Sequence, residues 1–134
     1  MPKVQILVLD DDTRFCELLV QILEHAGYSV VGLGSAMDAL ARFDELAPGL
    51  IVLDMMMPGM DGFEFLARLR KDPARNRVPV LISSTLGGTL ERAIDATSAQ
   101  TLGIVGVLAK PLAIDALLET VRATVGPGDR AAAG

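Results

Sequence analysis

The amino-acid sequence predicts an α/β protein in which a parallel β-sheet carries helices on both of its faces, in three layers. Two observations lead to this prediction. Short, apolar, β-prone segments alternate along the 134-residue chain with segments whose apolar residues recur at helical spacing. Five such strand–helix pairs fit this length, and right-handed crossovers between parallel strands distribute the five helices over both faces of the sheet.

The first two strand–helix pairs lie in the N-terminal third of the chain. Residues 4–9 form a continuous β-prone run that is mostly apolar, as expected for a strand that is buried on both faces. Apolar residues at helical spacing follow over residues 15–23, and Gly27 is a suitable helix stop. Residues 28–31 then predict a short second strand, and residues 36–43 predict a weaker second helix.

The third and fourth strands are separated by a turn-rich loop and a helix. Residues 51–53 predict the third strand, which leads directly into Asp54. Apolar residues form one face of a third helix over residues 63–69, with Asp61 placed to cap its N-terminus. Residues 78–83 predict the fourth strand.

The last two pairs differ in the strength of their pattern. Residues 87–100 predict a helix, although its apolar stripe is poor, and residues 104–109 predict the fifth strand. Residues 114–125 form the clearest amphipathic helix of the chain. We therefore expect one domain over residues 1–125 and a flexible tail rich in Gly, Ala and Pro over residues 126–134.

The composition excludes several classes of protein. Hydrophobic residues make up 51% of the chain and charged residues 22%, which excludes an intrinsically disordered protein. A net charge of −5 without a Lys/Arg cluster argues against direct binding of nucleic acid. The single cysteine, Cys16, cannot form an internal disulfide, and the first apolar run is too short for a signal peptide or membrane span. We expect a cytoplasmic protein that does not insert into membranes.

Polar residues follow four of the five predicted strands. Asp10 and Asp11 follow the first strand, Asp54 the third, Ser84 the fourth and Lys110 the fifth. The carboxyl ends of parallel strands lie along one edge of an open sheet, where such proteins bind their ligands. We therefore expect these side chains to converge.

These residue types suit the transfer of a phosphoryl group to a carboxylate. Mg²⁺ prefers a few carboxylates together with water and phosphate oxygens. A bound cation would offset the repulsion between Asp54 and a charged phosphoryl group, and Lys110 would add a second positive charge. Asp12, the third acidic residue after the first strand, has a simpler interpretation as the cap of the following helix.

Taken in chain order, these strand-end motifs resemble those of the receiver domain of bacterial two-component response regulators. The resemblance is to the single-domain receivers of the chemotaxis type. The resemblance covers residues 4–125. It depends on the acidic pair, an Asp-x-x-x-Pro-Gly-x-Asp-Gly loop that begins at Asp54, the hydroxyl of Ser84, and Lys110-Pro111. The resemblance implies a flavodoxin-like, doubly wound fold with strand order 2-1-3-4-5.

The resemblance also implies a role for each site residue. Asp54 is the expected phosphoacceptor, and Ser84 and Lys110 are expected to contact the phosphoryl oxygens. We expect a cis peptide bond before Pro111 to aim the lysine. Mg²⁺ is the expected cofactor, and Mn²⁺ could replace it. Its expected ligands are Asp11 and Asp54 directly, Asp10 through water, and the backbone carbonyl of Met56.

The partners follow from the same resemblance. The expected phosphoryl donor is a sensor histidine kinase or a histidine phosphotransfer protein, and the expected output is altered docking to a downstream protein. A phosphorylation-dependent homodimer belongs to the same expectation. The chain would not be an enzyme acting on a separate substrate, because it would catalyse only its own phosphorylation and dephosphorylation.

Three positions near the phosphoryl site are expected to modulate its chemistry: Thr85, Leu86 and Val107. Thr85 is β-branched where the family has a small residue, so it could narrow access to the phosphoacceptor. Val107 stands where the family has Tyr or Phe, and it has no ring to switch between buried and exposed positions. The stretch from Ser84 to Lys110 is longer than usual, which predicts a fourth helix that is shifted, lengthened or mobile.

Two other classes of function fit less well. An aspartate-nucleophile phosphatase would need a second carboxylate two residues after the nucleophile, where this chain has Met56. A flavin or nucleotide binder would need a Gly- or Ser/Thr-rich loop after the first strand, which instead holds three aspartates. A non-phosphorylated receiver that docks constitutively and a receiver fragment of a larger regulator stay open. So does the use of Ser83 or Thr85 in place of Ser84.

Overall fold

The computed structural model of the chain describes residues 4–72, 77–85 and 102–128. A five-stranded sheet crosses the molecule, and every pair of neighbouring strands is parallel. The strand order is β2-β1-β3-β4-β5, so the predicted fold class and order are both confirmed. The strands are β1 (Ile6–Leu9), β2 (Val30–Leu33), β3 (Leu50–Asp54), β4 (Val80–Ser84) and β5 (Ile104–Ala109).

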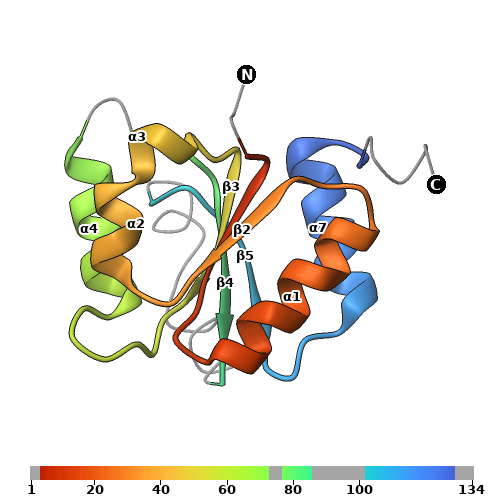
Figure 1. Cartoon of the computed structure of the whole chain (residues 1–134), viewed down its shortest axis with the longest axis horizontal. Coiled ribbons are helices and arrows are strands. Elements are labelled where there is room, and N and C mark those ends of the chain that lie inside the picture. Colours follow the sequence, from red (N-terminus) through yellow and green to blue (C-terminus); the bar gives the residue numbers. More distant parts are fainter. Residues whose placement is uncertain (1–3, 73–76, 86–101, 129–134) are drawn as a thin grey trace.

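Helices cover both faces of this sheet (Figure 1). The helices within the described ranges are α1 (Thr13–His25), α2 (Ala36–Ala41), α3 (Phe43–Leu46), α4 (Gly62–Lys71) and α7 (Ile114–Val125). Figure 1 shows α1 and α7 on one side of the sheet and α2, α3 and α4 on the other, which gives the three predicted layers. None of these helices is both long enough and apolar enough to cross a membrane.

The central strands β1 and β3 are buried along their whole length because each side of the sheet has its own core. Side chains alternate between the two faces of a strand. In β1, Leu7 and Leu9 pack with residues of α2, α3 and α4, whereas Ile6 and Val8 pack with residues of α1 and α7. Continuous apolar runs are thus required here, as the sequence predicts.

The second strand begins at Val30, two residues later than predicted. The chain is still completing the end of α1 before that point. Gly27 adopts a φ of 101°, and the N–H of Tyr28 bonds to the carbonyl of Leu23. The buried Tyr28 side chain donates its hydroxyl to the carbonyl of Gly126 at 2.7 Å, so the start of the predicted tail contacts the domain.

The predicted helix over residues 36–43 is two short helices that meet at Arg42. Arg42 has φ −101° and ψ 5°, outside the helical range, and it ends α2 while it begins α3. The interruption lets Ala39, Phe43 and Leu46 all reach the same core. The predicted helix over residues 87–100 lies outside the described residues.

Candidate functional site

The three aspartates after β1, residues 10–12, occupy different structural positions. Asp10 is buried, and its Oδ1 accepts the N–H of Asp12 at 2.9 Å, while Asp11 is exposed at the edge of the sheet. Asp12 is the N-cap of α1, and its Oδ1 accepts the N–H of Phe15 at 3.1 Å. The predicted assignment of Asp12 as a helix cap is confirmed. Asp10 and Asp11 remain as candidate site residues.

Asp54 is the last residue of β3 and is only 4% exposed. Its Oδ1 accepts the N–H of Met56 at 3.1 Å, which fixes the carboxylate at the start of the following loop. Burial raises the pKa of the Asp54 carboxyl from 3.8 to about 6. The Met56 N–H lowers the pKa, the charges of Asp10 and Asp11 raise it, and Lys110 lowers it. The site therefore favours added positive charge.

Lys110 follows β5 and reaches back over both buried carboxylates. Its Nζ lies 2.8 Å from Oδ2 of Asp10 and 3.7 Å from Oδ2 of Asp54. The contact with Asp10 is a hydrogen bond, so the lysine's closer partner is the first-strand carboxylate and not the expected phosphoacceptor. The predicted cis peptide bond between Lys110 and Pro111 is present.

The carboxylates form a potential cation site. One oxygen from each of Asp10, Asp11 and Asp54 lies within 4.8 Å of the other two. Within the described residues Lys110 is the ammonium that contacts these carboxylates, so three negative charges face one positive charge. Asp11 is exposed, which leaves one side of the site open to solvent. This donor set fits Mg²⁺, which binds a few carboxylates and keeps water or phosphate in its other positions.

Two neighbouring serines end β4, and both are buried. Ser83 lies opposite Asp54 in the strand register, but its Oγ makes no hydrogen bond within the described residues. Ser84 instead lines a cavity next to Met56, together with the loop that follows Asp54. Ser84 thus lies beside the loop, while Thr85 is exposed just beyond the strand. The expected contact of Ser84 with phosphoryl oxygens stays a prediction.

A family model described as the response regulator receiver domain matches residues 6–122. The chain belongs to this family. The receiver is 35% identical over 130 residues to the DNA-binding dual master transcriptional regulator RpaA of Synechocystis sp., over 97% of this chain and 52% of that protein. It is 37% identical over 120 residues to the transcriptional regulatory protein ZraR of Salmonella typhimurium, over 89% of this chain and 26% of that protein. The chain therefore spans about half of the length of RpaA and about a quarter of the length of ZraR.

Solved structures show the same fold. The receiver domain of the Francisella response regulator 1452 has a TM-score of 0.77 at 29% identity, over 91% of this chain and 96% of that one. The Vibrio cholerae chemotaxis protein CheY4 has a TM-score of 0.77 at 26% identity, over 90% and 98%. A sensor protein from Polaromonas sp. JS666 reaches 0.82 at 23% identity, over 92% and 97%, which supports the fold alone.

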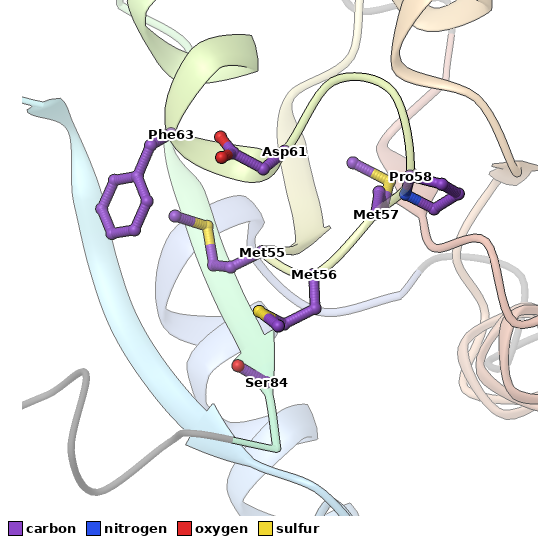
Figure 2. Close-up of a pocket in the computed structure, with 7 residues that line it drawn as sticks. All are labelled: Met55, Met56, Met57, Pro58, Asp61, Phe63 and Ser84. Atoms are coloured by element: carbon purple, nitrogen blue, oxygen red, sulfur yellow. The ribbon is translucent and has the colours of Figure 1, made fainter.

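The receiver's loop after Asp54 lines an open pocket of about 480 Å³, together with Phe63 and Ser84 (Figure 2). Figure 2 shows Met55 and Met56 between Phe63 and Asp61 on one side and Ser84, at the tip of β4, on the other, whereas Met57 lies beside Pro58. Met55 and Met57 are buried, as expected for side chains that fill the loop, whereas Met56 is 58% exposed. Thioethers are soft ligands that do not suit Mg²⁺, so a cation at this loop would use backbone or carboxylate oxygen.

The predicted modulating positions lie at different depths. Val107 pairs with Ile82 in the β4–β5 register and packs, partly buried, against the core that contains α4. Thr85 is exposed beside the site. Leu86 lies outside the described residues. Their effect on the chemistry stays a prediction.

One residue at the receiver's site was not predicted from the sequence. The Lys110 Nζ lies 4.4 Å from the centre of the Phe15 ring. The sequence pattern assigns Phe15 only to the apolar stripe of α1. Its position in the first turn, directly after the acidic run, is the signal that could have placed it at the edge of the sheet.

Proposed function

We propose that this receiver domain accepts a phosphoryl group on Asp54, with Mg²⁺ as cofactor and Mn²⁺ able to replace it. The donor is a sensor histidine kinase or a histidine phosphotransfer protein. One observation carries the proposal: Asp54, buried at the end of β3, shares a potential cation site with Asp10 and Asp11 and lies 3.7 Å from the ammonium of Lys110. The proposed nucleophile, the proposed cation ligands and the lysine therefore lie together at one edge of the sheet.

Each side chain has a distinct role in this proposal. The Asp54 carboxylate attacks phosphorus and forms a new O–P bond, while the P–N bond to the donor's histidine breaks and its imidazole leaves. The Met56 N–H holds the attacking carboxylate in place. Asp11, Asp54 and the Met56 carbonyl would hold the cation directly and Asp10 would hold it through water, and the bound cation would offset charge repulsion. Lys110 and Ser84 contact the phosphoryl oxygens once the new bond has formed.

The output of phosphorylation would be a change in protein docking. An aspartyl phosphate adds roughly −1.5 to −2 charges and strong acceptor oxygens at the edge of the sheet. Drawing Ser84 toward these oxygens would shift the chain after β4 and alter a binding surface. We infer a cytoplasmic protein that binds a downstream protein or a second copy of itself, does not itself contact nucleic acid, and catalyses only its own phosphorylation and dephosphorylation.

The test is intact-mass spectrometry after incubation with acetyl phosphate and Mg²⁺. We expect one added phosphoryl group on the wild-type chain and none on Asp54→Asn or in the presence of EDTA. The acidic run offers a matched set of variants. Asp11→Asn should slow phosphorylation because it removes a cation ligand, whereas Asp12→Asn should not, because Asn caps a helix as well as Asp does.

Each result has a consequence for the proposal. A phosphorylated Asp54→Asn variant would move the acceptor to another residue. An unmodified wild-type chain would first be tested with a panel of phosphorylated histidine kinases. Failure with every kinase would overturn the proposal in favour of a receiver that docks constitutively.

A second proposal concerns the size of the complete protein. The match to RpaA covers 97% of this chain but 52% of RpaA, which favours a receiver that forms one part of a longer regulator. Immunoblotting of the source organism with an antibody against this domain measures the mass of the endogenous protein. A band near 14.1 kDa would contradict the second proposal, and a band of about twice that mass or more would support it.

A further inference from the structure

Lys110 has three neighbours that together define where its ammonium lies. Asp10 accepts a hydrogen bond at 2.8 Å, Asp54 is at 3.7 Å, and the centre of the Phe15 ring is at 4.4 Å. A cation within about 6 Å of a ring centre is attracted by the electrons of the ring face. The ring therefore supplies a contact for the ammonium that is not a carboxylate.

Phe15 is itself held from two directions. Its backbone N–H bonds to Oδ1 of Asp12, the N-cap of α1, so the first turn of the helix fixes the position of its Cα. Its side chain packs against the core beneath α1 and α7, where the partly buried Leu108 and Leu112 also lie. The ring that meets Lys110 therefore belongs to a side chain that is partly buried and carried by the first turn of α1.

The two kinds of contact constrain the lysine differently. A hydrogen bond to Asp10 uses one N–H donor in a fixed direction, whereas attraction to a ring face requires no particular donor direction. The ammonium can thus turn its N–H groups from Asp10 toward Asp54 or a phosphoryl oxygen while it stays over the ring. A lysine without this surface has a flexible four-carbon stem that can extend into solvent.

We propose that Phe15 is a positioning residue for phosphorylation: its ring holds the ammonium of Lys110 over Asp54 and keeps it available to the incoming phosphoryl group. The inference rests on the proposed phosphorylation of Asp54. It assigns to an apolar residue of α1 a part in chemistry that takes place at the ends of β1, β3 and β5.

The first test compares phosphorylation rates with a small phosphodonor, which removes any effect of kinase docking. Phe15→Leu keeps an apolar side chain but loses the ring, and it should lower the rate constant at saturating acetyl phosphate by about two- to thirtyfold. Phe15→Tyr should retain most of the rate. Ile22→Ala is a matched control, because Ile22 is also partly buried against this core but lies about 10 Å further along α1.

A graded series separates the ring's electrons from its shape. Replacing Phe15 by increasingly fluorinated phenylalanines weakens the negative face of the ring and leaves its size almost unchanged. We expect the logarithm of the rate constant to fall steadily along the series. In a Lys110→Met background the series should have no effect, because the cation is absent. Equal rates along the series in the wild-type background would overturn the proposal and leave Phe15 a packing residue.

A second measurement does not depend on phosphorylation. The ε-methylene of Lys110 is bonded to the Nζ that lies 4.4 Å from the ring centre. We therefore expect the NMR signals of its protons to be shifted upfield in the wild-type chain and to return to the usual lysine position in Phe15→Leu. Unshifted signals in the wild type would overturn the inference about Phe15. An upfield shift together with an unmodified Asp54 would instead count against the proposed phosphorylation alone.

Discussion

Asp54 has two requirements that oppose each other. It must be ionised to act as the proposed nucleophile, yet it is almost completely buried and lies close to two other carboxylates. The pKa of Asp54 is raised to about 6 because burial and the neighbouring carboxylates disfavour its charged form. This difference in pKa corresponds to a free energy of unfolding that is lower by roughly 3 kcal/mol when Asp54 is charged in the cation-free protein.

The first prediction concerns the stability of Asp54→Asn. Without a divalent cation at pH 7.5, this variant should be about 1–3 kcal/mol more stable than the wild type, because the amide keeps an acceptor for the Met56 N–H and carries no charge. Urea unfolding in EDTA measures the difference. Asp12→Asn, which preserves the helix cap, should change the free energy of unfolding by less than about 0.5 kcal/mol.

The pH dependence of that difference tests its cause. The folded state holds the Asp54 proton up to about pH 6, whereas the unfolded chain releases it near pH 3.8, so the folded state binds more protons in this window. Stability attributable to Asp54 is therefore present below about pH 4 and is lost as the pH rises to about 6. The advantage of Asp54→Asn should shrink toward zero at pH 4. A constant advantage at all pH values would exclude an electrostatic origin.

At the scale of secondary-structure elements, Arg70 ties α4 to the sheet. Its Nε donates to the carbonyl of Leu102 at 2.8 Å and one terminal nitrogen donates to the carbonyl of Val78 at 2.7 Å. These carbonyls lie just before β5 and β4, so one side chain fixes where both strands begin. The strand ends that carry Ser84 and Lys110 lie at the opposite end of the same strands and depend on that register.

The second prediction follows from this anchor. Arg70→Met should lower the free energy of unfolding by about 2–3 kcal/mol, because it leaves two partly buried carbonyls without their charged donor. Arg68→Met on the same helix is the control. Arg68 is half-exposed and makes an ion pair of 3.9 Å with Glu64, so its loss should cost at most about 0.5 kcal/mol in chemical unfolding. Equal losses for both variants would contradict the assigned anchor.

How far the sequence predicts the structure also differs from element to element. Strands β1 and β3 were predicted because burial on both faces demands a continuous apolar run, and Asp54 was placed because it ends such a run. The start of β2 was wrong because the apolar Tyr28 continues the strand pattern, although its N–H still bonds within the end of α1. The break at Arg42 leaves the buried face unchanged, so periodicity cannot detect it.

For the candidate site, the sequence predicts which residues gather at the strand ends but not which of them contact one another. The sequence identifies the three carboxylates, the Ser84 hydroxyl and Lys110 as candidates, because polar residues at the ends of buried strands stand out against apolar runs. The pairing of Lys110 with Asp10 was not predicted, because a choice between two neighbouring carboxylates depends on fractions of an ångström. The contact between Phe15 and Lys110 was also missed, since 95 residues separate the two positions and the ring matches the helical apolar pattern equally well.

At the scale of the whole molecule, the charge of the acidic edge links cation binding to folding. The three carboxylates come from the ends of β1 and β3, which meet only in the folded sheet. A cation that binds this arrangement and not the unfolded chain stabilises the protein by an amount that grows with its concentration. Lys110 is the single cation that contacts Asp10 and Asp54 within the described residues, so a net negative charge remains that a divalent cation would offset.

The third prediction is that Mg²⁺ raises the melting temperature of the wild-type chain at pH 7.5, with a rise of about 2.7 kcal/mol in unfolding free energy when its concentration is 100 times its dissociation constant. Differential scanning calorimetry at constant ionic strength measures the effect, with NaCl replacing MgCl₂ in the reference. Asp11→Asn should reduce the response strongly and Asp12→Asn should leave it unchanged. The response should weaken as the pH falls below about 6, because a proton on Asp54 competes with the cation. An equal response in Asp11→Asn and Asp12→Asn would show that the ion acts elsewhere on the acidic surface, and the carboxylates of β1 and β3 would lose their assigned role as its ligands.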